Sequence, residues 1–147
     1  DKIGKYDSLK LENQLCFPLY AVSREIVKKY KPFLDKLDLT YTQYITMMVL
    51  WEYGQMNVKE LGEHLYLDSG TLTPVLKKLE QKGWVERARD RMDERVLMVT
   101  LTPEGRKLQE QAADVPAQIG ACIRIEEKEA IQLYHTLYQI LNGITSE

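Results

Sequence analysis

The chain has 147 residues, of which 44% are hydrophobic and 29% are charged, and its formal net charge is −2. This composition excludes a disordered or collagen-like chain and predicts one globular domain over 1–147. No apolar run approaches the roughly 18 residues that a membrane-spanning helix needs, and the charged N-terminus is unlike a signal peptide, so we expect a cytoplasmic protein without a membrane partner.

The N-terminal third is predicted to be helical. Apolar residues recur every three or four positions over 11–26, which is typical of a helix with one buried face. Pro18 indicates either a kink in this helix or a helix start just before Cys16. The Lys-Pro pair at 31–32 predicts its end, with a short helical turn to follow. We expect Thr42 to cap the next helix and Gly54 to end it.

Two short helices are predicted next. Asn57 starts a capping-box pattern that opens a helix from 58 to about 65. The second helix is expected to begin at Ser69 or Thr71 and to stop at Gly83. The short turn at 66–68 between them predicts a helix-turn-helix.

The pattern then changes to a ribbon. Residues 84–87 and 96–101 are predicted as two short strands, joined by a charged loop at 89–95. A two-stranded ribbon is not stable alone, so it must be attached to a helical body. Thr102 and Pro103 predict the start of a helix with a kink at Pro116, and Glu126 opens the last helix.

The predicted fold is therefore mainly α with a small β-ribbon. A winged helix-turn-helix module at about 42–101 lies between terminal helices at about 8–37 and 102–145. Both terminal segments carry long apolar stripes in addition to what a small core needs. Such surplus apolar faces indicate a second subunit, so we expect a homodimer formed through the N- and C-terminal helices.

Positive charge gathers after the helix-turn-helix, although the whole chain is slightly acidic. Three acidic residues in 77–91, Glu80, Glu86 and Asp90, leave a local excess of +3. The six cations of this segment are Lys77, Lys78, Lys82, Arg87, Arg89 and Arg91. A local basic face of this kind is what a nucleic-acid binder needs, whatever its net charge.

The second short helix and the ribbon are the candidate contacts with a double-stranded DNA operator. Hydroxyls and free N–H groups at a helix start reach bases and phosphates, lysines attract phosphates, and arginines on a ribbon suit a narrow minor groove. In the alternative interpretation the hydroxyls are only caps and the lysines only a solvated face. The candidate residues are Asp68, Ser69, Thr71, Thr73, Lys77, Lys78, Arg89, Arg91, Asp93 and Arg95.

The wing segment resembles the MarR family of transcription regulators. Residues 93–95 (Asp-Glu-Arg) match the D-x-R signature of that family, and 101–105 (Leu-Thr-Pro-Glu-Gly) match its L-T-x-x-G. Residues 79–85 match the exit of its recognition helix. The resemblance implies a homodimer on a pseudo-palindromic operator, with Asp93 bracing the wing and Arg95 entering the minor groove. Alternatively, Arg95 only braces the wing by pairing with Asp68 or Asp93.

The two cysteines, Cys16 and Cys122, are far apart in the sequence and form no CxxC motif. With only two histidines beside them, we expect no metal site, and nothing in the sequence indicates a cofactor. On residue type alone, buried and inert thiols are the expectation.

A closer resemblance changes this expectation. Residues 15–20 (Leu-Cys-Phe-Pro-Leu-Tyr), 23–25, 30–32 and 66–74 resemble the organic hydroperoxide resistance regulators. The resemblance implies that Cys16 senses peroxide and that Tyr20 and Tyr30 donate hydrogen bonds to its thiolate, in part across the dimer. Pro18 departs from the family pattern, which has a larger apolar residue there. Cys122 fits the two-cysteine type of the family, which forms a disulfide between subunits, although an apolar stripe also suits a core thiol.

Two other functions remain open on the sequence. The first is a MarR-type repressor that a small aromatic ligand releases from DNA, with structural cysteines. The second is an enzyme such as a thiol peroxidase. No Ser-His-Asp or paired-carboxylate arrangement is visible, so we do not expect an enzyme.

Overall fold

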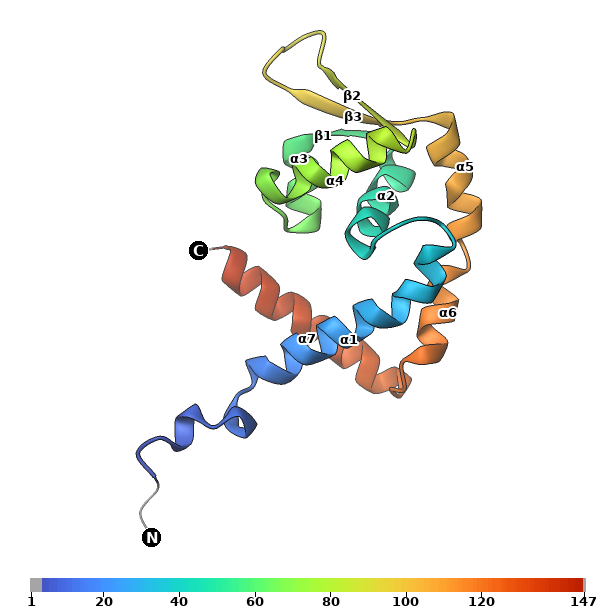
Figure 1. The fold of residues 1–147 in the computed structure, drawn as a ribbon. Coiled ribbons are helices and arrows are strands. Elements are labelled where there is room, and N and C mark those ends of the chain that lie inside the picture. The colour runs from blue at the N-terminus through green and yellow to red at the C-terminus, as the bar shows by residue number, and fades with distance from the viewer. Residues whose placement is uncertain (1–3, 147) are drawn as a thin grey trace.

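The computed structural model describes residues 4–146, and Figure 1 shows the path of the chain. Two 3-10 turns, Asp7–Leu9 and Leu11–Asn13, lead into the first helix. The helices are α1 (Cys16–Asp35), α2 (Tyr41–Tyr53), α3 (Val58–Leu65), α4 (Ser69–Gln81), α5 (Pro103–Ala112), α6 (Val115–Cys122) and α7 (Glu127–Thr145). The strands are β1 (Gln55–Asn57), β2 (Val85–Arg89) and β3 (Leu97–Leu101).

Helix α1 begins at Cys16, which confirms the second of the two interpretations of Pro18. Proline fits the first turn because the N–H groups there have no partner within the helix. The predicted end at 31–32 is wrong, since α1 continues through Pro32 to Asp35. Leu34 is buried in the core and continues the helix, and its carbonyl accepts hydrogen bonds from the N–H groups of Leu37 (2.9 Å) and Leu39 (3.0 Å).

The cap of α2 is Thr40, and the expectation of Thr42 is wrong. Thr40 and Gln43 form a complete capping box, in which each side chain accepts a hydrogen bond from the backbone N–H of the other. Gly54 ends α2 with φ 81°, as predicted. Asn57 caps α3, also as predicted, because its Oδ1 accepts from the N–H of Glu60 at 2.8 Å.

The helix-turn-helix is confirmed as α3 and α4. Its turn is tight, since Tyr66 has φ 55° and a Cβ on Gly62 would lie 2.6 Å from the carbonyl oxygen of Leu67. Asp68 caps α4 by accepting from the N–H of Thr71 at 2.7 Å. Glycine is therefore required at 62, and the cap sets where the second helix begins.

The sheet has three strands in the order β1-β3-β2, so the prediction of a two-stranded ribbon lacked one strand. Strand β3 pairs antiparallel with β2 on one side and with β1 on the other. The third strand, β1, has only three residues, and one of them, Asn57, is of a type that is depleted in strands. It anchors the base of the wing to the helix-turn-helix.

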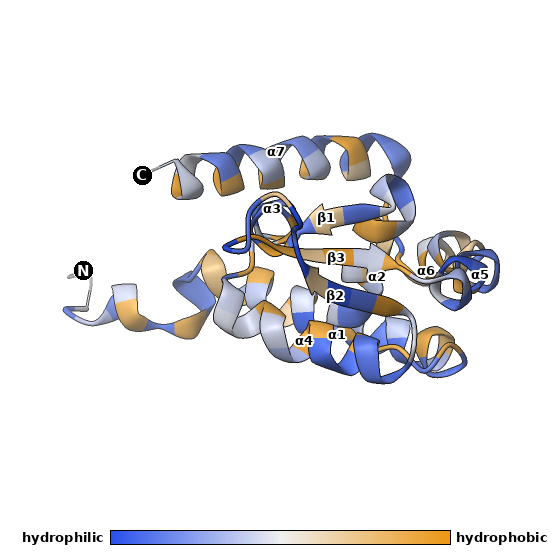
Figure 2. Cartoon of the chain, turned by 90° about the horizontal axis from the view of Figure 1, so that it is seen from above, coloured by the Kyte–Doolittle hydropathy of each residue, from blue (hydrophilic) through white to orange (hydrophobic). Residues whose placement is uncertain are grey.

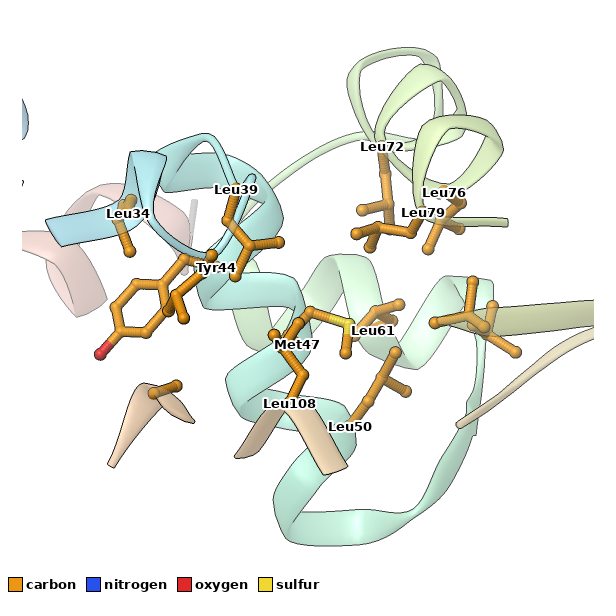
Figure 3. Close-up of a cluster of buried hydrophobic side chains, with 14 of the residues drawn as sticks. Leu34, Leu39, Tyr44, Met47, Leu50, Leu61, Leu72, Leu76, Leu79 and Leu108 are labelled. Carbon is orange, nitrogen blue, oxygen red and sulfur yellow. The ribbon is translucent and has the colours of Figure 1, made fainter. Parts of the chain in front are cut away.

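The core is centred on the winged-helix module and extends to Leu108 and Ala112 of α5 and Val115 of α6 (Figure 3). Leucines from α3 and α4 meet Met47 and Leu50 of α2, while Leu34 and Leu39 close the side next to α1. The largest side chains that are almost completely buried include Met47, Leu50, Leu61, Leu72, Leu76 and Leu79.

The C-terminal part differs from the expected single kinked helix. Pro116 lies in the first turn of a separate helix, α6, and residues 113–114 separate α6 from α5. Helix α7, which does begin after Glu126, has no buried residue in the single chain. In Figure 2, hydrophobic segments in orange recur along α7. None of the helices within 4–146 is long and apolar enough to cross a membrane.

The terminal helices leave an open apolar groove. It has a volume of about 590 Å³ and is lined mainly from α1, with Leu133 and Leu137 from α7. The lining includes Pro18, Leu19, Val22 and Ile26 of α1 and Leu15, which directly precedes the helix. The predicted surplus of apolar surface at both ends of the chain is thus confirmed.

Candidate DNA interface and thiol site

Helix α4 presents its polar residues on the side opposite to the core. Leu72, Leu76 and Leu79 are buried, whereas Ser69, Thr71, Lys77 and Lys78 are exposed. Thr73 is half-buried, and its hydroxyl donates a 2.6 Å hydrogen bond to the carbonyl oxygen of Ser69. The core therefore fixes which face of α4 is available to a partner.

Two of the six cations in 77–91 are bound within the protein. The guanidinium of Arg87 lies 3.0 Å from Oε1 of Glu80, and its backbone N–H donates to Oε2 at 3.1 Å. These bonds hold the pKa of Glu80 below its ordinary value. Lys82 is 18% exposed and faces the turn before α2. The cations at the surface of this segment are Lys77, Lys78, Arg89 and Arg91.

The tip of the wing is ordered by a pair of charged residues. Nε of Arg95 donates to Oδ1 of Asp93 at 3.0 Å, and its Nη2 donates to Oδ2 at 3.1 Å. The N–H of Arg95 also donates to Oδ1 at 3.1 Å. These hydrogen bonds hold the pKa of Asp93 below its ordinary value. The Arg95 side chain is 90% exposed, so the pair orients it without covering it.

Four of the predicted residues line one groove between α3, the start of α4 and the wing. They are Asp68, Ser69, Thr73 and Arg95, and the groove has a volume of about 1120 Å³. Asn57, Lys59 and Tyr66 also line this groove and were not predicted from the sequence as part of the interface. Their place depends on β1 and on the left-handed turn at Tyr66, for which the sequence has no clear signal.

Cys16 is the first residue of α1, and its thiol is free and exposed. A thiolate at a helix start is stabilised by the helix dipole and the free N–H groups of the first turn. Tyr20 lies one turn further on, where its hydroxyl accepts from Nη1 of Arg24 at 3.3 Å. Leu15 and Pro18, on either side of Cys16, line the apolar groove.

Tyr30 is remote from Cys16 within one chain. The two residues are 14 positions apart on the same helix, which corresponds to about 21 Å along its axis. Tyr30 packs against Tyr41 and Tyr44, with ring centroids 4.9 and 5.8 Å away. Burial raises the pKa of its phenol. Any hydrogen bond from Tyr30 to Cys16 must therefore cross between subunits.

Cys122 is the last residue of α6 and, like Cys16, is free and exposed. The expectation of buried thiols from residue type is wrong for the single chain, because α6 ends at Cys122 and the apolar stripe no longer faces the core there. In Figure 1 the start of α1 and helix α6 lie on opposite sides of the molecule. Residues 4–146 contain no group of three side chains suited to hold a metal ion.

Comparisons with known proteins agree with these features. Residues 28–112 match the family model of the transcriptional regulators SarA/Rot. The chain is 50% identical over 141 residues to the organic hydroperoxide resistance transcriptional regulator of Bacillus subtilis, with 96% of both chains covered. It is 44% identical over 127 residues to the HTH-type transcriptional regulator SarZ of Staphylococcus aureus, with 86% of both covered.

The fold is shared with solved regulators. Reduced AbfR bound to DNA is 39% identical, with a TM-score of 0.77 over 97% of this chain and 99% of that one. AbfR is a protein of Staphylococcus epidermidis. Its disulfide form gives 0.67 at 39% identity, over 96% of both chains. A mutant MarR of E. coli with operator DNA, 22% identical, gives 0.75 over 95% and 99% and shows the fold alone. The chain belongs to the MarR family of winged helix-turn-helix transcriptional regulators, in the branch of the organic hydroperoxide resistance regulators.

Proposed function

We propose that this protein is a dimeric DNA-binding repressor that leaves its operator when an organic hydroperoxide oxidises Cys16. The observation that carries the proposal is the exposed thiol of Cys16 at the start of α1, on a winged-helix scaffold. The 50% identity to an organic hydroperoxide resistance regulator supports the class of oxidant. The DNA complexes of AbfR support the DNA partner.

The exposed face of α4 enters the major groove, and the wing follows the adjacent minor groove. Asp68 starts α4 so that Ser69, Thr71 and Thr73 lie in its first turn and a half, followed by Lys77 and Lys78. In a symmetric dimer, the two copies of α4 bind half-sites about 34 Å apart. A second copy of the chain covers the apolar faces of α1 and α7, and these terminal helices of both subunits together form the dimer frame.

The chemical step takes place at the sulfur of Cys16. Its thiolate attacks the outer oxygen of the hydroperoxide, the O–O bond breaks, and the alkoxide takes up a proton and leaves as the alcohol. The sulfur is oxidised to sulfenic acid and the peroxide is reduced. Hydrogen bonds from Tyr20 and from Tyr30 of the partner subunit stabilise the thiolate. The apolar side chains beside Cys16 favour an organic peroxide over hydrogen peroxide.

Cys122 of the partner subunit then condenses with the sulfenic acid. Its thiol attacks the sulfur, an S–S bond forms, and the hydroxyl leaves as water. The bond requires the two Cα atoms to come within about 7 Å, and a resting dimer that holds them further apart must shift its terminal helices against each other to form it. This chain superposes better on reduced, DNA-bound AbfR than on its disulfide form, with TM-scores of 0.77 and 0.67, which supports such a shift.

A second candidate function is release by a small aromatic ligand without oxidation. The groove of about 1120 Å³ between α3, α4 and the wing favours it, because a ligand in this groove would occupy the DNA-facing side. In this case neither cysteine takes part.

One experiment separates the two functions. Operator binding by the reduced protein is measured by fluorescence anisotropy, with increasing cumene hydroperoxide or with an aromatic acid such as salicylate. We expect release by the peroxide, reversal by a dithiol and no release by the acid. Release by the acid alone, or equal release of Cys16→Ser by the peroxide, would reject the proposed function.

A further inference from the structure

The exit of α4 is tied to the turn between α1 and α2 by one lysine. Nζ of Lys82 donates to the carbonyl oxygen of Asp38 and, at 3.1 Å, to Oε1 of Gln43. The same nitrogen lies 3.5 Å from Oδ2 of Asp38 and 5.2 Å from the centre of the Trp84 ring. An ammonium has three N–H donors, and this site offers three acceptors.

Lys82 differs in this respect from Lys77 and Lys78, which are exposed on α4. The Lys82 side chain is 18% exposed, so it is not available to phosphate. A lysine held in one conformation loses side-chain entropy and part of its hydration, which is offset here by the three acceptors and the aromatic ring. Its charge therefore acts within the protein.

Each partner of Lys82 is itself held in place. Asp38 has φ 55°, and its neighbours Leu37 and Leu39 are buried in the core. Gln43 belongs to the capping box of α2, and its Oε1 also accepts from the N–H of Thr40 at 3.1 Å. A displacement of the end of α1 must therefore move these acceptors together.

Lys82 itself belongs to the short segment that links the recognition helix α4 to the wing. Lys82 is the C-cap of α4, and Trp84 stands directly before β2 of the wing. The hydroxyl of Thr102, before α5, donates to the carbonyl oxygen of Gly83 at 2.7 Å. The short exit 82–84 thus connects the α1–α2 turn and the start of α5 to α4 and the wing.

We propose that Lys82 is the positioning residue that transmits a displacement of α1 to the recognition helix α4. The inference rests on the proposed function. Cys16 and the α1–α2 turn lie at opposite ends of one continuous helix of 20 residues, about 30 Å long, so a tilt of the helix at one end displaces the other end. The leucines of the core make non-directional contacts, whereas hydrogen bonds constrain both a distance and an angle between the groups that they join. The end of α4 therefore follows Asp38 through Lys82.

The test compares operator affinity before and after oxidation in Lys82→Met. Methionine keeps the length and apolar stem of lysine but has no N–H donor. We expect similar operator affinity for the reduced variant and wild type, and unchanged oxidation of Cys16. The ratio of oxidised to reduced Kd should fall at least about tenfold relative to wild type. Lys36→Met, which removes an exposed lysine from the same turn, is the matched control and should keep the full ratio.

A merely structural role gives a different result. It would lower the thermal midpoint and weaken both redox forms equally, so an unchanged ratio in Lys82→Met would overturn the inference. Asp38→Asn tests the same contact in a second way, because asparagine tolerates positive φ but removes the carboxylate, and it should lower the ratio partly. If wild type itself loses no affinity on oxidation, the proposed function fails and this inference fails with it.

Discussion

The geometry of the wing is compatible with both roles considered for Arg95, which are bracing the wing and contacting DNA. Its guanidinium is paired with Asp93 and yet is 90% exposed, so it is oriented and accessible at once. If Arg95 only braces the wing, its role is to stabilise the fold. If its guanidinium points into a minor groove, its role is to contact DNA.

We expect Arg95→Ala to weaken operator binding on the order of tenfold and to reduce the slope of log K against log salt by about one. The reason is the loss of one cation from the nucleic-acid face. The measurement is a salt series of binding isotherms, with Lys107→Ala on α5 as the control. If both affinity and slope stay at the wild-type values, Arg95 has no contact with DNA.

Asp68 gives a prediction on pH. Hydrogen bonds from the N–H groups at the start of α4, with Thr71 the strongest donor, hold its pKa below the ordinary value of about 3.9. A depressed pKa in the folded state stabilises the fold above the ordinary pKa, and this stabilisation is lost as pH falls through the lower value. Between pH 5 and pH 2, denaturant melts of wild type should therefore lose more stability than those of Asp68→Asn, which keeps a neutral cap. Parallel curves would contradict the charged cap.

At the scale of the elements, some helix and strand boundaries follow from local sequence signals, whereas others depend on tertiary contacts. The caps Asn57 and Thr102, whose side chains accept from the N–H three residues on, were predicted from this local signal. The same signal at Thr40 was assigned to Thr42 instead. The end of α1 was not predicted, because burial of Leu34 continues the helix past Pro32. Strand β1 was missed because only its pairing with β3 makes it a strand.

The site residues divide in the same way. Cys16, Asp93 and Arg95 were predicted from local motifs, and the last two do form a hydrogen-bonded pair. Lys82 and Arg87 were counted with the basic surface, but both are bound within the protein by partners on other elements. Nothing in the sequence near Lys82 indicates Asp38, which lies 44 positions away.

The turn of the helix-turn-helix gives a prediction on stability. In Gly62→Ala the new Cβ would lie 2.6 Å from the carbonyl oxygen of Leu67, so the turn must open. We expect a loss of about 1–3 kcal/mol in the free energy of unfolding. Gly120→Ala is the matched control, because its Cβ meets nothing within 4 Å in α6 and should leave stability unchanged or raise it by up to about 1 kcal/mol. Equal denaturant midpoints for the two variants would show that the turn has no such constraint.

At the scale of the whole molecule, both ends of the chain require a second copy. Helix α7 has no buried residue, and α1 buries only Leu34 in the single chain. The proposed hydrogen bond from Tyr30 to the Cys16 thiolate would need the same second copy, since the two residues lie far apart on α1 within one chain. Under the proposed function, dimerisation and sensing would therefore depend on the same frame of terminal helices, α1 and α7.

Cys122 gives a prediction for this frame. After one equivalent of cumene hydroperoxide, wild type should run as a covalent dimer on a non-reducing gel, and Cys16→Ser and Cys122→Ser as monomers. Cys122→Ser should still be oxidised at Cys16, to sulfenic acid or beyond. A monomeric wild type with Cys16 oxidised and Cys122 free by mass spectrometry would make this a one-cysteine sensor.

The most direct test of redox-controlled repression follows oxidation and DNA release in one sample. Reduced protein bound to labelled operator is titrated with cumene hydroperoxide, while anisotropy reports bound DNA and mass spectrometry reports the state of Cys16. We predict that release rises in proportion to the oxidised fraction of Cys16, and that Cys16→Ser stays bound throughout. Full oxidation of Cys16 with the operator still bound would contradict the account.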